Sequence, residues 1–256
     1  RLSTGAGRVA LVTGGGTGIG AASAEALARS GFAVAINGRR AHVLKDTASS
    51  IQERVPDAEV ASFKADIGVA KEATDLVRRV IERFERIDVL VSSAAAYEAM
   101  HVLDIDAEHW DRTMDVAVRG SVLCSVEAAR FMRGGGGGRI ILVSSVSGTA
   151  SEGVSTAYCA AKAAIDSLAR SMAVDLSDHG IAVNAVAPGW VETPMVQEDL
   201  DNATPELLRR LNPLGRMGKP EELAEVIRWL ATDAPPFLTG TTIAVDGGQS
   251  AQAPNP

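Results

Sequence analysis

The chain has 256 residues, of which 46% are hydrophobic and 22% charged, and its formal net charge is −7. This length and balance predict a single globular domain over residues 1–256 with a large buried core. The negative charge and the dispersed basic residues argue against a nucleic-acid partner. No apolar run approaches the roughly 20 residues that span a membrane, so no membrane partner is expected.

Two cysteines, Cys124 and Cys159, lack the spacing of a disulfide framework or of metal ligands, and no metal is expected. The opening RLSTGAG lacks the apolar core of a secretory signal, which favours a cytoplasmic protein. Small molecules are therefore the expected partners.

Seven apolar, strand-like runs alternate with segments of helical periodicity. Most of the runs are continuously apolar, as buried parallel strands are, and the segments between them are long enough for crossover helices. The expected strands are RVALVTG, FAVAING, AEVASFKAD, IDVLVSSA, GRIILVSS, IAVNAVAPG and TTIAVDGG. The expected helices lie near residues 18–30, 41–54, 69–86, 106–131, 156–178 and 220–232. This alternation predicts an α/β fold, a doubly wound Rossmann domain whose seven-stranded parallel sheet is flanked by helices.

Two segments fall outside this alternation. Residues 190–219 are polar and interrupted by prolines. A loop of that length is usually functional or disordered, and we favour a substrate lid. Residues 249–256, QSAQAPNP, are polar enough to form a flexible tail.

The first strand runs directly into a helix through VALVTGGGTGIGAA, with Gly14, Gly18 and Gly20 at the junction. Glycines there allow a tight turn and let backbone N–H groups approach a pyrophosphate closely. The stretch from Gly16 to Ala21 also fits the alternative spacing G-x-G-x-x-A, and a tight turn without a ligand is the plainer interpretation. The position on the first strand-to-helix turn favours a dinucleotide site.

The second strand ends in AINGRR. An NAD site of this kind places an acidic residue about 20 residues after the glycines, where it binds the ribose 2′-hydroxyl. Gly38, Arg39 and Arg40 occupy that region instead. Two solvated arginines at a helix start would explain the pattern, but a cation there favours the 2′-phosphate, so NADP(H) is expected rather than NAD(H).

The stretch YCAAK places Tyr158 and Lys162 one turn apart on an expected helix. A neighbouring ammonium lowers a phenol pKa that starts near 10, so this tyrosine could exchange a proton near neutral pH. Ser144 and Ser145 end the strand RIILVSS at the edge of the sheet where ligands bind. Taken singly, a serine cap and a half-buried helix edge would explain these residues, and Tyr-x-x-x-Lys occurs by chance in many proteins.

Together these residues resemble the short-chain dehydrogenase/reductase family, over almost the whole chain. The marks are TGGGTGIG at 13–20, AD at 65–66, Ser145 thirteen residues before the tyrosine of YCAAK, and APGWVET at 187–193. In bulk the chain is similar to 3-oxoacyl-thioester reductases and to sugar or polyol dehydrogenases, and one sequence does not separate the two. The resemblance implies hydride transfer between nicotinamide C4 and a carbonyl or alcohol carbon, and a homotetramer or homodimer.

The resemblance also implies roles for single residues. Tyr158 would be the general acid or base, Lys162 would contact the nicotinamide ribose, and Ser145 would orient the substrate carbonyl. The implied cofactor-binding residues, besides Tyr158 and Lys162, are Gly14, Gly16, Thr17, Gly18, Ile19, Gly20, Arg39, Asp66, Ile67, Ser93, Ala94, Val116, Pro188, Gly189, Val191 and Thr193. Residues 97–100, 147–155 and 190–214 are expected to line a pocket for a medium-sized carbonyl compound without strong charge.

The chain departs from the family pattern at two places. The usual Asn-Asn-Ala-Gly after the fourth strand is SSAA at 92–95, and Ala117 replaces an asparagine that in the family helps to hold a water linking the lysine to solvent. Alanine cannot make that hydrogen bond. Three interpretations are open: another group completes the proton path, the path is weakened, or the protein binds a nucleotide with weak or no catalysis. The retained Ser145, Tyr158 and Lys162 favour the first two. Dehydration or epimerisation with a retained nicotinamide is a further alternative.

Overall fold

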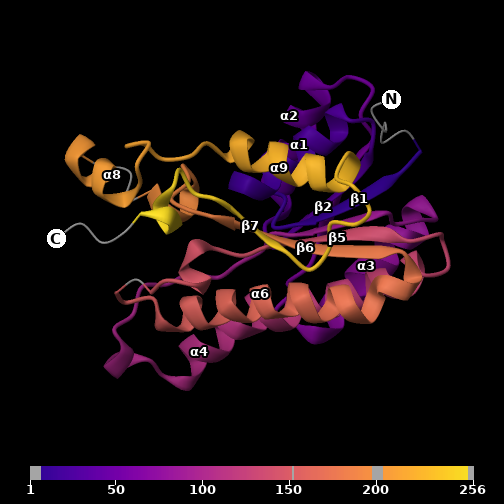
Figure 1. Cartoon of the computed structure of the whole chain (residues 1–256). Helices are drawn as coiled ribbons and strands as arrows, with labels where there is room; N and C mark the ends of the chain where they lie inside the picture. Colours follow the sequence, from indigo (N-terminus) through magenta and orange to yellow (C-terminus); the bar gives the residue numbers. More distant parts are fainter. Residues whose placement is uncertain (1–6, 152, 198–203, 253–256) are drawn as a thin grey trace.

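The computed structural model describes residues 7–151, 153–197 and 204–252. Seven strands form one sheet in the order β3-β2-β1-β4-β5-β6-β7, and every pairing is parallel (Figure 1). The strands are β1 (Val9–Thr13), β2 (Ala33–Gly38), β3 (Val60–Lys64), β4 (Val89–Ser92), β5 (Gly138–Val143), β6 (Ile181–Pro188) and β7 (Thr242–Val245). The α/β, doubly wound sheet predicted from the sequence is confirmed.

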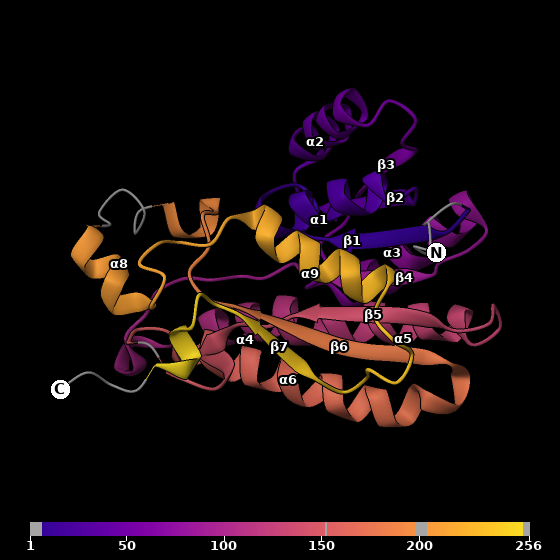
Figure 2. The same ribbon diagram turned by 45° about the horizontal axis from the view of Figure 1, so that its top comes forward.

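Helices cover both faces of the sheet (Figures 1 and 2). One face carries α1 (Gly18–Arg29), α2 (Ala41–Arg54) and α9 (Pro220–Thr232), and the other carries α3 (Ala70–Phe84), α4 (Ala107–Met114), α5 (Ser121–Met132) and α6 (Thr156–Leu176). Successive side chains of a strand point to opposite faces. In β1, Leu11 therefore packs with the α3, α5 and α6 side chains, whereas Val12 packs with those of α1, α2 and α9.

The helix predicted over 106–131 is divided into three parts. Between α4 and α5, residues Asp115–Gly120 form a π-helical segment. Gly120 packs against the connection between β3 and α3. A Cβ atom on Gly120 would lie 2.6 Å from the Ile67 carbonyl oxygen. The apolar periodicity did not reveal this segment, because one widened turn barely disturbs a pattern read over many residues. Such segments often occur at functional sites, and this one contains Ala117.

The segment 190–219 leaves the sheet after β6 and returns to α9. It contains a 3₁₀ turn at Pro194–Val196 and the helix α8 (Pro205–Leu211). A parallel bridge joins Val191 to Gly218, so the two ends of this segment lie side by side. Its assignment as a substrate lid stays a prediction, and residues 198–203 lie outside the described part.

The end of the chain differs in part from the flexible tail predicted over 249–256. Gln249–Ala251 form a 3₁₀ helix. The Asp246 carboxylate accepts hydrogen bonds from the backbone N–H groups of Gly248 and Ser250, at 2.9 and 2.7 Å. These residues are therefore anchored, while residues 253–256 lie outside the described part.

The described strands all belong to one sheet, and whether residues 1–256 form a single domain stays a prediction. Among the helices that the structure describes, none combines the length and apolar character that crossing a bilayer requires. The same residues contain no cluster of three or more His, Cys, Asp or Glu side chains arranged to hold a metal ion.

Candidate active site

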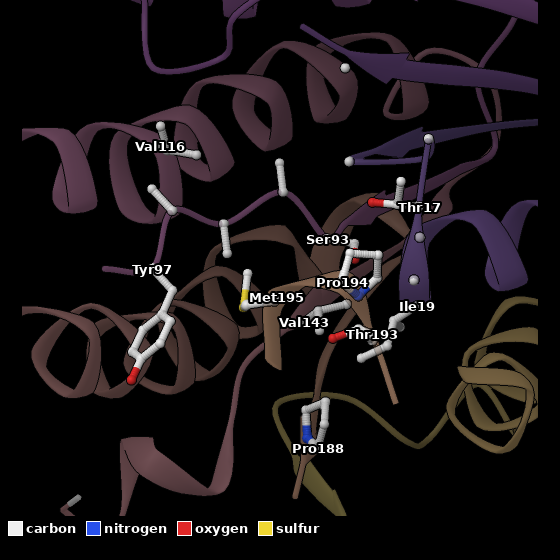
Figure 3. Close-up of a pocket in the computed structure, with 18 of the residues that line it drawn as sticks. Thr17, Ile19, Ser93, Tyr97, Val116, Val143, Pro188, Thr193, Pro194 and Met195 are labelled. Atoms are coloured by element: carbon white, nitrogen blue, oxygen red, sulfur yellow. The ribbon is translucent and has the colours of Figure 1, made fainter. Parts of the chain in front are cut away.

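One cleft of about 310 Å³ lies at the carboxyl ends of β1, β2, β4, β5 and β6. All the catalytic and cofactor-binding residues predicted from the sequence line it, from the glycine turn at one end to Tyr158 at the other. Of the stretches predicted to line a substrate pocket, Tyr97, Ser147 and residues 190, 191 and 193–196 line the cleft. Figure 3 shows Thr17 and Ile19 at one side of the cleft and Tyr97 at the opposite side. In doubly wound sheets this edge is where ligands bind.

The glycine turn after β1 leaves no room for side chains. Gly14 has a φ of +65°, and a Cβ atom there would lie 2.8 Å from the Ala94 Cα atom. A Cβ atom on Gly20 would lie 2.3 Å from the Gly14 carbonyl oxygen. The side chain of Thr17 does not cap α1, and the first turn of α1 has no acidic residue. The first N–H groups of α1 are thus free of a side-chain cap, and they fit a pyrophosphate.

Arg39 and Arg40 follow β2, are exposed and line the cleft. Neither forms an ion pair with a carboxylate in the described ranges. Asn37, which the sequence analysis did not single out, is buried and donates hydrogen bonds to the carbonyl oxygens of Phe63 and Ala65 at 3.0 and 3.2 Å. Its amide fixes β3, and with it the position of Asp66, beside the arginines.

Asp66 lines the cleft, and its Oδ1 atom accepts a hydrogen bond from the Gly68 N–H at 2.9 Å. On the other side of β1, the Thr13 hydroxyl oxygen lies 3.1 Å from the Ser93 nitrogen and 3.4 Å from the Ala94 nitrogen. The Thr13 hydroxyl oxygen therefore accepts hydrogen bonds from both N–H groups and holds this turn against the end of β1.

Ser145 follows β5 and caps a 3₁₀ turn at Val146–Gly148. Its hydroxyl oxygen accepts a hydrogen bond from the Ser147 N–H at 3.1 Å, and its hydroxyl donates to the Ser147 hydroxyl oxygen, also at 3.1 Å. Because Ser147 is buried and lines the same cleft, these bonds hold the Ser145 side chain toward the cleft rather than toward solvent.

Tyr158 and Lys162 lie one turn apart on α6. The Lys162 Nζ atom is 5.4 Å from the centroid of the Tyr158 ring and donates to the Val143 carbonyl oxygen at 2.8 Å. Burial lowers the pKa of Lys162 from 10.5 to about 8, and the charge of Asp166 opposes this shift. Burial penalises the charged form of a lysine, whereas a nearby carboxylate favours it. Lys162 remains mainly an ammonium at neutral pH.

Ala117 is buried in the π-helical segment. Its carbonyl oxygen accepts a hydrogen bond from the Ser121 hydroxyl at 2.6 Å, and the Ser121 oxygen accepts one from the Ser92 hydroxyl at 2.9 Å. A chain of two serine hydroxyls thus ends on the backbone at the altered position. Neither serine was assigned a role from the sequence, because they are 29 residues apart and only folding brings them together.

The family model described as enoyl-(acyl carrier protein) reductase matches residues 14–250. This match spans both the glycine turn and α6. The chain belongs to the short-chain dehydrogenase/reductase family.

Named relatives of this short-chain dehydrogenase/reductase include reductases and dehydrogenases. It is 39% identical over 247 residues to cis-4-hydroxycyclohexanecarboxylate dehydrogenase of Sinomonas cyclohexanicum, covering 95% of this chain and 97% of the relative. It is 36% identical over 243 residues to 3-oxoacyl-(acyl-carrier-protein) reductase of Synechocystis sp., covering 94% and 96%. A short-chain dehydrogenase/reductase structure from Mycobacterium marinum superposes with a TM-score of 0.91 at 33% identity, covering 97% and 98%. The chain is therefore an oxidoreductase of this family.

Proposed function

We propose that the protein transfers a hydride between NADP(H) and a carbonyl or secondary alcohol, with Tyr158 as the general acid or base. The observation that carries this proposal is the convergence of Ser145, Tyr158 and Lys162 on the cleft that begins at the glycine turn. The bound nicotinamide would supply the hydride. The protein's own residues would bind the substrate oxygen, exchange its proton and hold the charge that assists the exchange.

Each of the three side chains has a distinct task in this proposal. The Ser145 hydroxyl, held toward the cleft by Ser147, would orient the substrate oxygen. The Tyr158 hydroxyl would give that oxygen a proton during reduction and remove one during oxidation. The Lys162 ammonium would stabilise the negative charge left on the phenol oxygen and would contact the nicotinamide ribose.

The remaining cofactor contacts are proposed for the other predicted residues. The turn from Gly14 to Gly20 would hold the pyrophosphate, and Asp66 would bind the adenine amino group beside Ile67. Ser93, Ala94 and Val116 would border the nicotinamide half. Pro188, Gly189, Val191 and Thr193 would frame the nicotinamide, and all of these residues line the cleft.

The substrate is proposed to be a medium-sized carbonyl compound without strong charge. Tyr97, Val146 and Met195 line the cleft and carry no charge. The relatives named for a hydroxycyclohexanecarboxylate and for a 3-oxoacyl carrier act on different compounds, so either chemistry fits the family.

The protein is further proposed to act in the cytoplasm as a homotetramer or homodimer. Apolar side chains that remain exposed on α5 and α6, among them Val126, Phe131 and Val174, support self-association, because a second copy would cover them.

The direct test mixes the protein with NADPH and a panel of uncharged cyclic and linear ketones. Loss of the nicotinamide absorbance is the expected result. Deuterium at C4 of the nicotinamide should appear at the former carbonyl carbon of the product. Turnover with deuterium retained on the nicotinamide would instead indicate dehydration or epimerisation.

Arg39 tests the preference for NADP(H). Replacing Arg39 by alanine should weaken NADPH binding about 10- to 100-fold, because a charge-assisted hydrogen bond to a phosphate contributes about 1.5–3 kcal/mol. NADH binding should change by less than about threefold, since NADH lacks the 2′-phosphate. Titrations with both nucleotides check this, with Arg133→Ala at the exposed end of α5 as the control. Equal losses for both nucleotides would contradict the role given to Arg39.

A nucleotide-binding protein with weak or no catalysis is the second candidate, and Ala117 is the observation that favours it. Its methyl group cannot replace the hydrogen bonds of an asparagine amide, and its carbonyl oxygen already accepts the Ser121 hydroxyl. This candidate predicts NADPH binding without turnover of any ketone in the panel.

The Ala117→Asn variant tests whether the altered position limits the proton path. If the altered position limits the proton path, this variant should raise kcat by about tenfold while NADPH affinity stays the same. Ala117→Leu is the matched control, because leucine resembles asparagine in size but has no hydrogen-bonding group. Equal rates in the two variants would show that packing, not a proton path, governs the position.

A further inference from the structure

The chain contains only two tyrosines, and they contact each other in the cleft. The ring centroids of Tyr97 and Tyr158 are 5.2 Å apart, and the ring planes meet at 74°. This edge-to-face arrangement is favourable for aromatic pairs. Tyr97 follows β4 whereas Tyr158 belongs to α6, so the contact joins two separate parts of the fold at the end of the cleft away from Thr17 (Figure 3).

Tyr97 is itself held by Ser155. The phenol oxygen of Tyr97 lies 3.4 Å from the Ser155 hydroxyl oxygen, a long hydrogen bond. The Ser155 hydroxyl donates to the Gly153 carbonyl oxygen at 3.2 Å. A serine hydroxyl has one hydrogen, so Tyr97 is the donor in the pair. Ser155 is 3% exposed and immediately precedes α6, one turn before Tyr158.

A backbone contact also joins the segment after β4 to the residues before α6. The Met100 N–H donates to the Val154 carbonyl oxygen at 2.8 Å, and Met100 forms a parallel bridge with Ser155. Val154 has a φ of +55°, a strained conformation for a β-branched residue. Because such a conformation persists only where its surroundings hold it, residues 97–100 are docked firmly against the start of α6.

The Tyr158 ring therefore contacts both a charged group and a second aromatic ring. Lys162 is 5.4 Å from its centroid and supplies the charge. Tyr97 is uncharged and supplies a contact that limits how the ring can turn. The other charged side chains that line the described cleft, Arg39, Arg40 and Asp66, follow β2 and β3.

We propose that Tyr97 is a positioning residue that holds the phenol of Tyr158 in the orientation from which its hydroxyl meets the substrate oxygen. The Tyr97 ring makes the contact, and its hydroxyl bond to Ser155 fixes the ring. This inference rests on the proposed function for the direction of the Tyr158 hydroxyl, but the contact itself can be tested without turnover.

The test uses tyrosine labelled with ¹³C in the ring. With two tyrosines in the chain, each residue gives its own set of NMR signals, and Tyr158→Phe assigns them. Tyr97→Leu should shift and broaden the Tyr158 signals, whereas Tyr97→Phe, which keeps the ring but loses the hydroxyl bond to Ser155, should shift them to a lesser extent. Unchanged Tyr158 signals in Tyr97→Leu would overturn the proposal.

Kinetics of the same variants separate positioning from general stability. Tyr97→Leu should lower kcat about 10- to 100-fold, the size expected for a misplaced reacting group, while the NADPH dissociation constant stays within about twofold. Tyr97→Phe, which keeps the ring contact but loses the bond to Ser155, should lower kcat by less than Tyr97→Leu does. Parallel losses of kcat and NADPH affinity in Tyr97→Leu would indicate a merely structural role.

The NMR experiment also decides the proposal if the parent shows no turnover or if Tyr97→Leu does not fold. If the parent reduces no ketone, the proposed function fails, and the Tyr158 signals alone decide whether Tyr97 positions that ring. If Tyr97→Leu does not fold, Ser155→Ala removes the hydroxyl partner of Tyr97, together with the bond to Gly153, and keeps both tyrosine rings. It should move the Tyr97 signals and, to a lesser extent, those of Tyr158, and unchanged signals would overturn the proposal.

Discussion

Replacing Tyr158 by phenylalanine should lower kcat for ketone reduction by about 10³-fold. The variant keeps the ring that packs against Tyr97 and Lys162 but loses the hydroxyl that is proposed to give a proton to the substrate oxygen. General acid–base groups contribute about 10²–10⁴-fold to enzymatic rates, so this is the largest effect expected from one substitution. Oxidation of saturating NADPH, followed with a ketone that the parent reduces, measures it.

The control is the neighbouring residue on α6. Cys159 lines a separate hollow beside Thr156 and Ala163 rather than the cleft, so Cys159→Ala should react at the parent rate within about twofold. Tyr158→Phe should bind NADPH within a few-fold of the parent, because the glycine turn that is proposed to hold the pyrophosphate is distant from the phenol oxygen (Figure 3). A parent-like kcat in Tyr158→Phe would assign the acid to another group.

The sheet was predictable because the apolar pattern that indicates each strand lies within the strand's own residues. The run FAVAING is apolar from Phe32 to Ile36, and a strand buried on both faces, with helical segments before and after it in the chain, accounts for this pattern. The π-helical segment Asp115–Gly120 was not predictable. It depends on Gly120 packing against Ile67, a contact between residues far apart in the sequence that periodicity cannot register.

The site was predictable to a similar extent. The glycine turn and the Tyr158–Lys162 spacing follow from the geometry of one turn and one helix, so their residues could be named from the chain alone. The contacts made by Asn37 and Ser121 were missed, because each is a polar residue whose partner lies on another element. Long-range partners of this kind become visible only when the chain is folded.

Lys162 should lower the stability of the folded protein while it supports the proposed activity. Its ammonium is buried, and burial lowers its pKa from 10.5 to about 8. Below pH 8 the side chain is charged in both the folded and the unfolded chain. The free energy of unfolding is then reduced by the full cost of burying the charge. That cost is about 3 kcal/mol, at about 1.4 kcal/mol for each pH unit between the two pKa values. It declines as the pH rises from 8 and is absent above 10.5.

Lys162→Met should therefore be more stable than the parent at pH 7. The gain is about 2 kcal/mol, because the Val143 carbonyl oxygen loses a hydrogen-bond donor whose contribution is about 1 kcal/mol. The gain should shrink between pH 8 and 10.5 and then reverse. Denaturant unfolding at pH 7 and pH 10 measures the change, and a loss of stability at pH 7 that does not depend on pH would contradict the cost assigned to the charge.

The same substitution should lower kcat by about 10²–10³-fold, because no cation remains to stabilise the negative charge on the Tyr158 oxygen. In the parent, the rate of reduction should fall as the pH rises through about 8, where the ammonium loses its proton. Lys162→Met has no group that titrates at this position, so its low rate should not show that fall. A pH–rate profile of both proteins distinguishes the two. If the parent and the variant lost activity over the same range, the titrating group would be one other than Lys162.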